Sequence, residues 1–210
     1  MSEAQETWYD RVYAAKTTEE TETAYGGWAA TYEEDLYKAG YRGPAIVASM
    51  LCRYLKPGPD PILDAAVGTG MTGDLLSVLG YQTLVGIDLS TDMLAIAEIK
   101  NLYSELRPMR LGDPLGFPDN HFAATLIVGA FTPGHAGPES IFELIRVTRP
   151  GAPIIFTLRV DDGVGDPFIA VQDSQEEKGQ WLLAEKTPPV NIMPVSEPDV
   201  FHRVYVYQAL

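Results

Sequence analysis

Between Ile62 and Val160 the chain alternates short apolar runs with amphipathic segments, and this alternation most limits the folds open to it. Runs such as "TLVGID" and "AATLIVGA" are apolar almost throughout, as strands buried on both faces are. The segments between them carry apolar residues at helical spacing. Strands that alternate with helices in this way form a parallel sheet covered on both faces. The sequence therefore predicts a doubly wound α/β fold.

The expected elements follow from this pattern. Strands are expected at 62–66, 83–88, 107–113, 123–130 and 152–160, and helices at 44–55, 72–80, 90–101 and 138–148. The β-rich runs 181–189 and 201–210 are joined by a stretch too rich in proline to be a crossover helix. We expect them to pair as an antiparallel hairpin at the sheet edge. Together the runs predict a Rossmann-like, mostly parallel, seven-stranded sheet.

The N-terminal residues do not show this alternation of strands and helices. They contain the polar run "TTEETE", followed by an aromatic-rich segment that glycines interrupt. We interpret them as two or three short helices outside the main sheet. The length of 210 residues suits one buried core. We therefore expect a single domain, in which residues 44–210 form the α/β unit and residues 1–43 a helical extension.

The charge balance limits the kinds of partner that the protein can bind. Lys plus Arg number 15 and Asp plus Glu 29, so the formal net charge is -14, which repels nucleic acid and anionic lipid. No stretch approaches the roughly 20 apolar residues of a membrane span, and the N-terminus is acidic where a signal peptide is basic. We expect a cytoplasmic protein without nucleic-acid or membrane partners. The lone Cys52 falls on the apolar stripe of its helix, where we expect it to be packed.

The run "DAAVGTGMTG" has the spacing G-x-G-x-x-G at Gly68, Gly70 and Gly73, after a strand and before a helix. This spacing is the dinucleotide fingerprint, in which bare backbone approaches a pyrophosphate. Here the strand ends in a carboxylate, Asp64. Two unit charges about 4 Å apart interact by roughly 1 to 4 kcal/mol, so an ionised Asp64 disfavours a pyrophosphate and favours a cation.

A second carboxylate, Asp88, ends the next strand, about 20 residues past the glycines, where an acid can accept hydrogen bonds from both hydroxyls of a ribose. One carboxylate for a ribose and one for a cationic group match S-adenosylmethionine, which has a ribose, an α-ammonium and a sulfonium and lacks a phosphate. Because Asp88 alone fits NAD equally well, an NAD(P)-dependent oxidoreductase is an alternative.

These motifs resemble those of the class I S-adenosylmethionine-dependent methyltransferases. "ILDAAVGTG" is similar to their first motif and "GIDLSTDML" to the acid after their second strand, while "GDPLGFPDNHFAATLIVGA" and "VTRPGAPIIF" are similar to the segments around strands four and five. "AYGGWAATYEEDLYKAGYRGP" and "IVGAFTPGH" resemble the methyltransferase-like proteins of the Williams-Beuren region. The sequence differs from the family's first motif at Ala66, where that motif usually has glycine.

The resemblance implies a cofactor site at the carboxyl ends of the strands. Asp64 would hold the methionyl amino group, Asp88 the ribose hydroxyls and Asp113 the adenine amino group. The expected cofactor residues are Tyr25, Trp28, Tyr32, Arg42, Asp64, Ala65, Gly68, Thr69, Gly70, Asp88, Leu89, Met93, Asp113, Pro114, Val128, Gly129 and Ala130. Small residues at the end of strand 123–130 would leave room for the sulfonium methyl.

The aromatic residues from Tyr25 to Tyr41 resemble a lid that folds over the cofactor, with Arg42 placed to pair with the methionyl carboxylate. We expect the residues before Pro44 to be mobile without ligand and ordered with it, because the run "TTEETETAYGG" is too polar and glycine-rich to pack alone. The alternative is an amphipathic extension whose aromatic side chains are simply core.

Three histidines are present. His135, just past strand 123–130, would face the acceptor as a general base or a contact, with a solvated loop residue as the alternative. We expect His121 in a turn and His202 on the surface of an edge strand. None of them has metal-ligand spacing with another His or Cys, so no metal is expected.

We therefore expect a methyltransferase that transfers a methyl group from S-adenosylmethionine to a small molecule by in-line displacement and releases S-adenosylhomocysteine. The sulfonium already activates the leaving group, so the protein has mainly to align donor and acceptor and exclude water. A regulatory or scaffold protein that binds the cofactor without turnover is the alternative. Oxygen, nitrogen, sulfur and carbon acceptors all fit the sequence.

Overall fold

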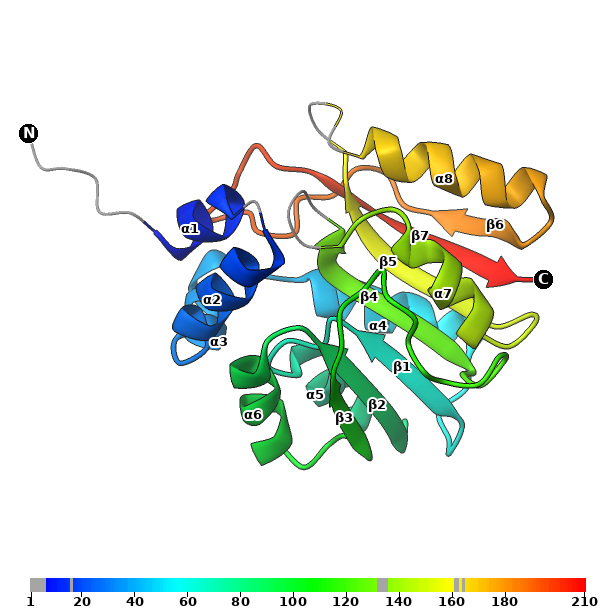
Figure 1. Cartoon of the computed structure of the whole chain (residues 1–210), viewed down its shortest axis with the longest axis horizontal. Coiled ribbons are helices and arrows are strands. Elements are labelled where there is room, and N and C mark those ends of the chain that lie inside the picture. Colours follow the sequence, from blue (N-terminus) through cyan, green and yellow to red (C-terminus); the bar gives the residue numbers. More distant parts are fainter. Residues whose placement is uncertain (1–6, 16, 132–135, 161–162, 164) are drawn as a thin grey trace, which may run out of the picture.

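A seven-stranded sheet in the order β3-β2-β1-β4-β5-β7-β6 forms the centre of the computed structural model (Figure 1). The structure describes residues 7–15, 17–131, 136–160, 163 and 165–210. The strands are β1 (Pro61–Ala65), β2 (Thr83–Asp88), β3 (Glu105–Pro108), β4 (Ala124–Phe131), β5 (Pro153–Arg159), β6 (Trp181–Lys186) and β7 (His202–Ala209). Strands β1 to β5 are parallel, and β7 is antiparallel to both β5 and β6. The predicted sheet and its edge hairpin are confirmed.

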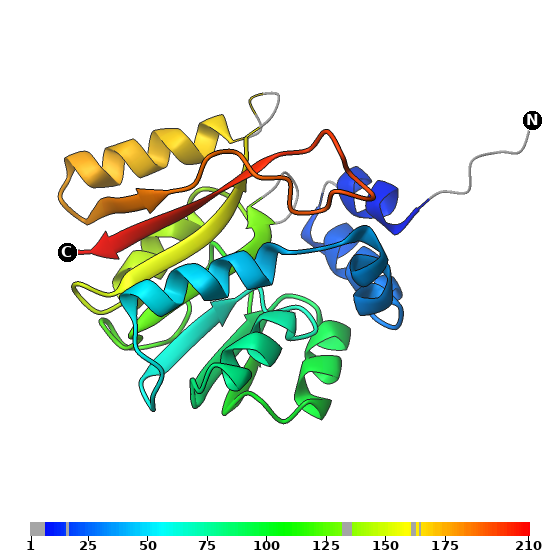
Figure 2. The ribbon, with the colours of Figure 1, turned by 180° about the vertical axis from the view of Figure 1, so that it is seen from behind.

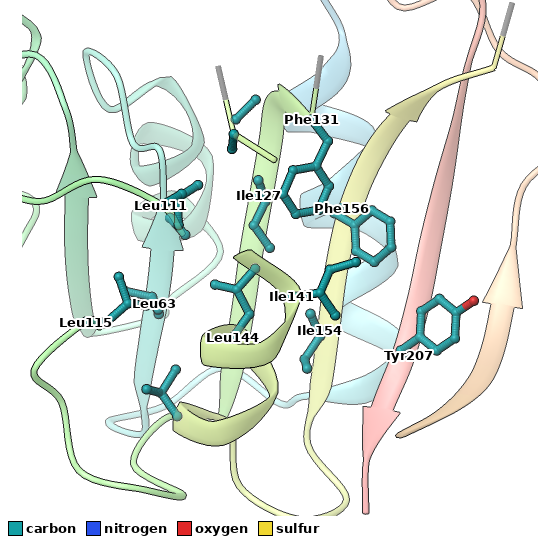
Figure 3. Close-up of a cluster of buried hydrophobic side chains, with 14 of the residues drawn as sticks. Leu63, Leu111, Leu115, Ile127, Phe131, Ile141, Leu144, Ile154, Phe156 and Tyr207 are labelled. Atoms are coloured by element: carbon teal, nitrogen blue, oxygen red, sulfur yellow. The ribbon is translucent and has the colours of Figure 1, made fainter. Parts of the chain in front are cut away.

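Alternate residues of each strand point to opposite faces of the sheet and form two cores. On one face Leu63 and Phe156 pack with helix α7 (Ser140–Val147), as Figure 3 shows. On the other face Ile62 and Ile155 pack with α4 (Gly43–Tyr54) and α5 (Met71–Val78), and Figure 2 shows α4 lying across that face. Helices therefore cover both faces, as the all-apolar strands require.

The helices differ from the prediction in two respects. Helix α4 forms where predicted, with Pro44 in its first turn, but Cys52 is exposed on its outer side instead of packed in its apolar stripe. Helix α8 (Asp166–Glu177) was not predicted at all. Helix α6 (Thr91–Ile99) begins as expected, after Ser90, whose hydroxyl accepts the N–H of Met93 at 3.3 Å.

Three short helices, α1 (Trp8–Ala14), α2 (Thr18–Trp28) and α3 (Tyr32–Ala39), precede α4. They gather at the carboxyl ends of the parallel strands (Figures 1 and 2). Thr7 and Thr17 each form a capping box, which fixes the starts of α1 and α2. We call residues 17–42 the lid. In the described part of the chain, no helix has the length and apolar character needed to cross a membrane.

The connection between β6 and β7, residues 187–201, folds back toward the lid. Asn191 holds its shape by donating from Nδ2 to the carbonyls of Glu197 at 2.7 Å and Pro198 at 2.8 Å. The backbone N–H of Arg42 donates to the carbonyl of Ile192 at 2.9 Å, which ties the connection to the lid. As a result His202, expected on the surface, is only 4% exposed.

Candidate functional site

The turn between β1 and α5 brings bare backbone to the carboxyl end of the sheet. Ala66, Gly68 and Gly70 have φ of 63°, 55° and 87°, all in the left-handed region. Ala66 thus keeps the backbone conformation that favours glycine, although it carries a side chain. A Cβ at Gly68 would meet no atom within 4 Å, so the backbone at Gly68 borders open space.

Asp88 stands at the end of β2, beside this turn. Its Oδ2 accepts the N–H of Gly68 at 2.8 Å, and its Oδ1 accepts the N–H of Ser90 at 2.9 Å. Burial raises the pKa of Asp88, while these backbone donors lower it. The carboxylate therefore fixes the glycine turn and the start of α6 relative to each other.

Asp64 is buried at the end of β1, with 1% of its surface exposed. The hydroxyl of Tyr103 donates to Asp64 Oδ2 at 2.7 Å and accepts the N–H of Gly73 at 3.1 Å. Burial raises the pKa of Asp64, the hydrogen bond from Tyr103 lowers it, and the negative charge of Asp88 raises it; together they bring the pKa to about 7. Asp64 consequently changes charge near neutral pH. Sequence reasoning missed Tyr103, because only the fold brings it to Asp64.

A cavity of about 690 Å³, including the solvent at its mouth, lies over the carboxyl ends of β1, β2 and β4. Nine predicted residues line it, namely Tyr25, Tyr32, Gly68, Asp88, Leu89, Met93, Val128, Gly129 and Ala130. Its other lining residues, which sequence reasoning missed, are Thr21, Glu22, Ala66, Ser90, Met109, Arg110, Leu111 and Ala136.

The structure does not bring the remaining predicted residues into this lining. Asp113 and Pro114 are exposed, and Asp113 pairs with Arg110 at 3.3 Å. Because β3 ends at Pro108, earlier than predicted, residues 109–111 occupy the place expected for 113 and 114. Those outside the lining are Trp28, Arg42, Asp64, Ala65, Thr69, Gly70, Asp113 and Pro114. His135 lies outside the described residues.

The lid covers the cavity and has a core of its own. Trp28 is 2% exposed and donates from Nε1 to Asp35 Oδ2 at 2.9 Å. Its ring meets that of Tyr32 edge to face, with 4.7 Å between the centroids. Tyr25 and Tyr32 face the cavity while Trp28 supports them, so the lid aromatics divide between the two predicted roles.

A lysine joins the lid to the α/β unit. Lys100 Nζ lies 2.6 Å from Glu33 Oε1 of α3 and 2.6 Å from Asp74 Oδ2 of α5. Only 17% of the Lys100 side chain is exposed, so solvent screens these contacts less than those of a surface pair. The lid is therefore held by charge as well as by aromatic packing.

Comparison with known proteins points to one family. Residues 62–151 match the family described as methyltransferase domain. The chain is 36% identical over 164 residues to methyltransferase-like protein 27 of Homo sapiens, a match that covers 75% of this chain and 66% of that protein. It is 32% identical over 109 residues to demethylmenaquinone methyltransferase of Symbiobacterium thermophilum, covering 49% and 43%. The chain thus spans about two thirds of the human relative and less than half of the bacterial one.

Solved structures agree on the fold. The [4+2]-cyclase SpnF has a TM-score of 0.72 at 13% identity, with 93% of this chain and 97% of that one covered. Geranyl diphosphate C-methyltransferase from Streptomyces coelicolor A3(2) has a TM-score of 0.59 at 11% identity, with 79% and 77% covered. The fold, the glycine turn with its two carboxylates and the sequence matches lead to one conclusion. The chain belongs to the class I S-adenosylmethionine-dependent methyltransferases, whose cofactor is S-adenosylmethionine.

Proposed function

We propose that this protein transfers the methyl group of S-adenosylmethionine to a small-molecule acceptor. The observation that carries the proposal is the cavity at the ends of β1, β2 and β4, which has a carboxylate, Asp88, in its wall and open space at Gly68. An adenosyl cofactor needs both features, because its ribose donates hydrogen bonds and its methionyl chain passes close to backbone.

Each part of the lining suits one part of the cofactor. Asp88 would accept the ribose hydroxyls, while Leu89 and Met93 would pack against the adenine. Gly129 and Ala130 at the end of β4 leave room near the reacting methyl group. When bound, the cofactor supplies an electrophilic methyl group on a sulfonium.

Two of the predicted residues that lie outside the lining, Asp64 and Arg42, would still contact the methionyl group. The carboxylate of Asp64 would balance the methionyl ammonium once the hydroxyl of Tyr103 turns away or a water joins them. Arg42, exposed at the start of α4, would pair with the methionyl carboxylate. Ala65, Thr69 and Gly70 would shape the turn.

The lid would exclude water and align the acceptor. Alignment and desolvation together contribute several kcal/mol in well-oriented reactions, so a transfer of this kind needs few reactive side chains. The net charge of -14 supports a small molecule as acceptor, because it disfavours the phosphates of RNA and DNA.

Calorimetry on the free protein tests the cofactor assignment. S-adenosylhomocysteine should bind and NAD and ATP should not. Asp88→Ala should weaken the binding of S-adenosylhomocysteine by roughly 1.5–3 kcal/mol, because hydrogen bonds to a charged group are lost, and Asp88→Asn should lose less. Glu98→Ala, which removes an exposed acid of α6, is the matched control and should leave the affinity unchanged. Tighter binding of NAD than of S-adenosylhomocysteine would refute the assignment.

A further inference from the structure

A second cavity, of about 500 Å³ including the solvent at its mouth, lies under the lid and adjoins the first. Tyr25, Tyr32 and Gly129 line both cavities, so the two meet beside the end of β4. In-line methyl transfer places the acceptor opposite the sulfur, directly beyond the methyl group. The second cavity is therefore where an acceptor would approach a methyl group held near Gly129.

The lining of the second cavity is aromatic and uncharged. Five tyrosines and Trp28 form much of its wall, and no Asp, Glu, Lys or Arg is among its described lining residues. An anionic acceptor would lack a cation there, and a protonated amine would find ring faces but no carboxylate to balance its charge. Flat aromatic side chains pack well against another ring. The chemistry of this wall selects a neutral acceptor that contains a ring.

His202 is the one imidazole among the described residues that line this cavity. It is the first residue of β7, buried, and opposite Arg159 of β5 in the sheet register. Strand β5 lies between β7 and β4, so His202 stands two strand spacings, about 10 Å, across the sheet from β4. Because Gly129 at the end of β4 and His202 line the same cavity, an acceptor hydroxyl held in that cavity can lie between them.

We propose that the second cavity binds the methyl acceptor, that this acceptor is a neutral phenol, and that His202 accepts its proton. The inference rests on the methyl transfer proposed above. The phenolic oxygen forms a bond to the methyl carbon, the carbon–sulfur bond breaks with its electron pair going to sulfur, and the proton passes to the imidazole and then to water. A phenol suits this base, because its pKa near 10 is much closer to that of imidazole than the pKa of an aliphatic alcohol.

Binding can be measured without turnover. Protein saturated with S-adenosylhomocysteine is titrated with three probes that share one ring system: 2-naphthol, 2-naphthoate and 2-naphthylmethylammonium. We expect 2-naphthol to bind at least tenfold more tightly than either ion. Met193→Trp, which fills the cavity, should weaken the binding of 2-naphthol at least tenfold and leave the affinity for S-adenosylhomocysteine unchanged. Tighter binding of either ion, or equal binding to Met193→Trp and wild type, would overturn the inference.

Transfer of a labelled methyl group to 2-naphthol tests His202 itself. His202→Ala should lower the rate at least 100-fold, the lower end for loss of a general base, and added imidazole should restore part of it. His121→Ala, which removes an exposed histidine outside the cavity, is the matched control and should leave the rate unchanged. A chain that binds S-adenosylhomocysteine but methylates no phenol, or for which His202→Ala has no effect, would disprove this inference alone. Failure to bind S-adenosylhomocysteine would instead disprove the proposed function.

Discussion

Asp64 should make the free protein less stable as the pH rises toward 8. Its pKa is raised from the ordinary 3.8 to about 7 by burial, so the folded chain holds a proton that the unfolded chain has already released. A raised folded-state pKa gives stability that is complete below pH 3.8 and is lost as the pH rises through 7. Substitution by asparagine removes this loss, because the amide cannot ionise and its oxygen still accepts the hydroxyl of Tyr103.

The size of the effect follows from the two pKa values. One pKa unit corresponds to 1.36 kcal/mol, so the carboxylate costs roughly 4 kcal/mol of unfolding free energy at pH 8 and roughly 1.5 kcal/mol at pH 5. The advantage of Asp64→Asn over wild type should therefore grow by about 2.5 kcal/mol between these pH values. The same substitution should weaken binding of S-adenosylhomocysteine, because in the proposed site an ionised Asp64 balances the methionyl ammonium.

Urea unfolding at pH 5, 6, 7 and 8 measures this difference directly. Asp60→Asn is the matched control: Asp60 is exposed and pairs with Arg149 at the surface, so its replacement should change stability by less than about 1 kcal/mol at each pH. If the curves of Asp64→Asn and wild type run parallel from pH 5 to 8, Asp64 does not titrate in this range. The argument from its burial would then be wrong.

Two further predictions concern the turn and the lid. Ala66→Gly should raise the unfolding free energy by about 0.5–1 kcal/mol, because glycine adopts a φ of 63° without strain. Ala65→Gly in β1 should instead lower the unfolding free energy, and thermal melts of both variants measure the two effects. Hydrogen exchange over residues 19–42 should slow when S-adenosylhomocysteine is added, and Lys100→Met should speed it by releasing α3 from α5. Equal protection with and without ligand would show that the lid aromatics are plain core.

The strands could be predicted because burial on both faces leaves an unbroken apolar run, as in β2 and β4. Helix α8 could not, since two of its three buried residues, Gln172 and Gln175, are polar. Two hydrogen bonds stabilise the buried Gln172. The hydroxyl of Tyr207 donates to its Oε1 at 3.0 Å, and Nε1 of Trp181 donates to its backbone carbonyl at 3.1 Å. Hydrogen bonds made across the fold thus replaced the apolar periodicity on which helix prediction depends.

The same distinction holds in the candidate site. Gly68 and Asp88 could be predicted because each stands where a strand ends, and the ends of parallel strands meet at one edge. Arg110 was missed because its place depends on where the weak strand β3 stops. His202 was wrongly predicted to be exposed, because the connection 187–201 folds back over it. The backbones of Val190 and His202 form hydrogen bonds with each other there. A strand pattern alone does not show which loop will cover it.

The two cavities share Tyr25, Tyr32 and Gly129 but otherwise draw on different residues of the chain. Of the described residues lining the second cavity, only Gly129 falls within the matched family range of 62–151, and the others come from the first 41 residues or from residues 192–202. Substitutions accumulating at the two ends can therefore reshape the proposed acceptor side while the glycine turn and Asp88 stay intact. Descendants of one ancestral gene could acquire new acceptors in this way without first losing the methyl donor.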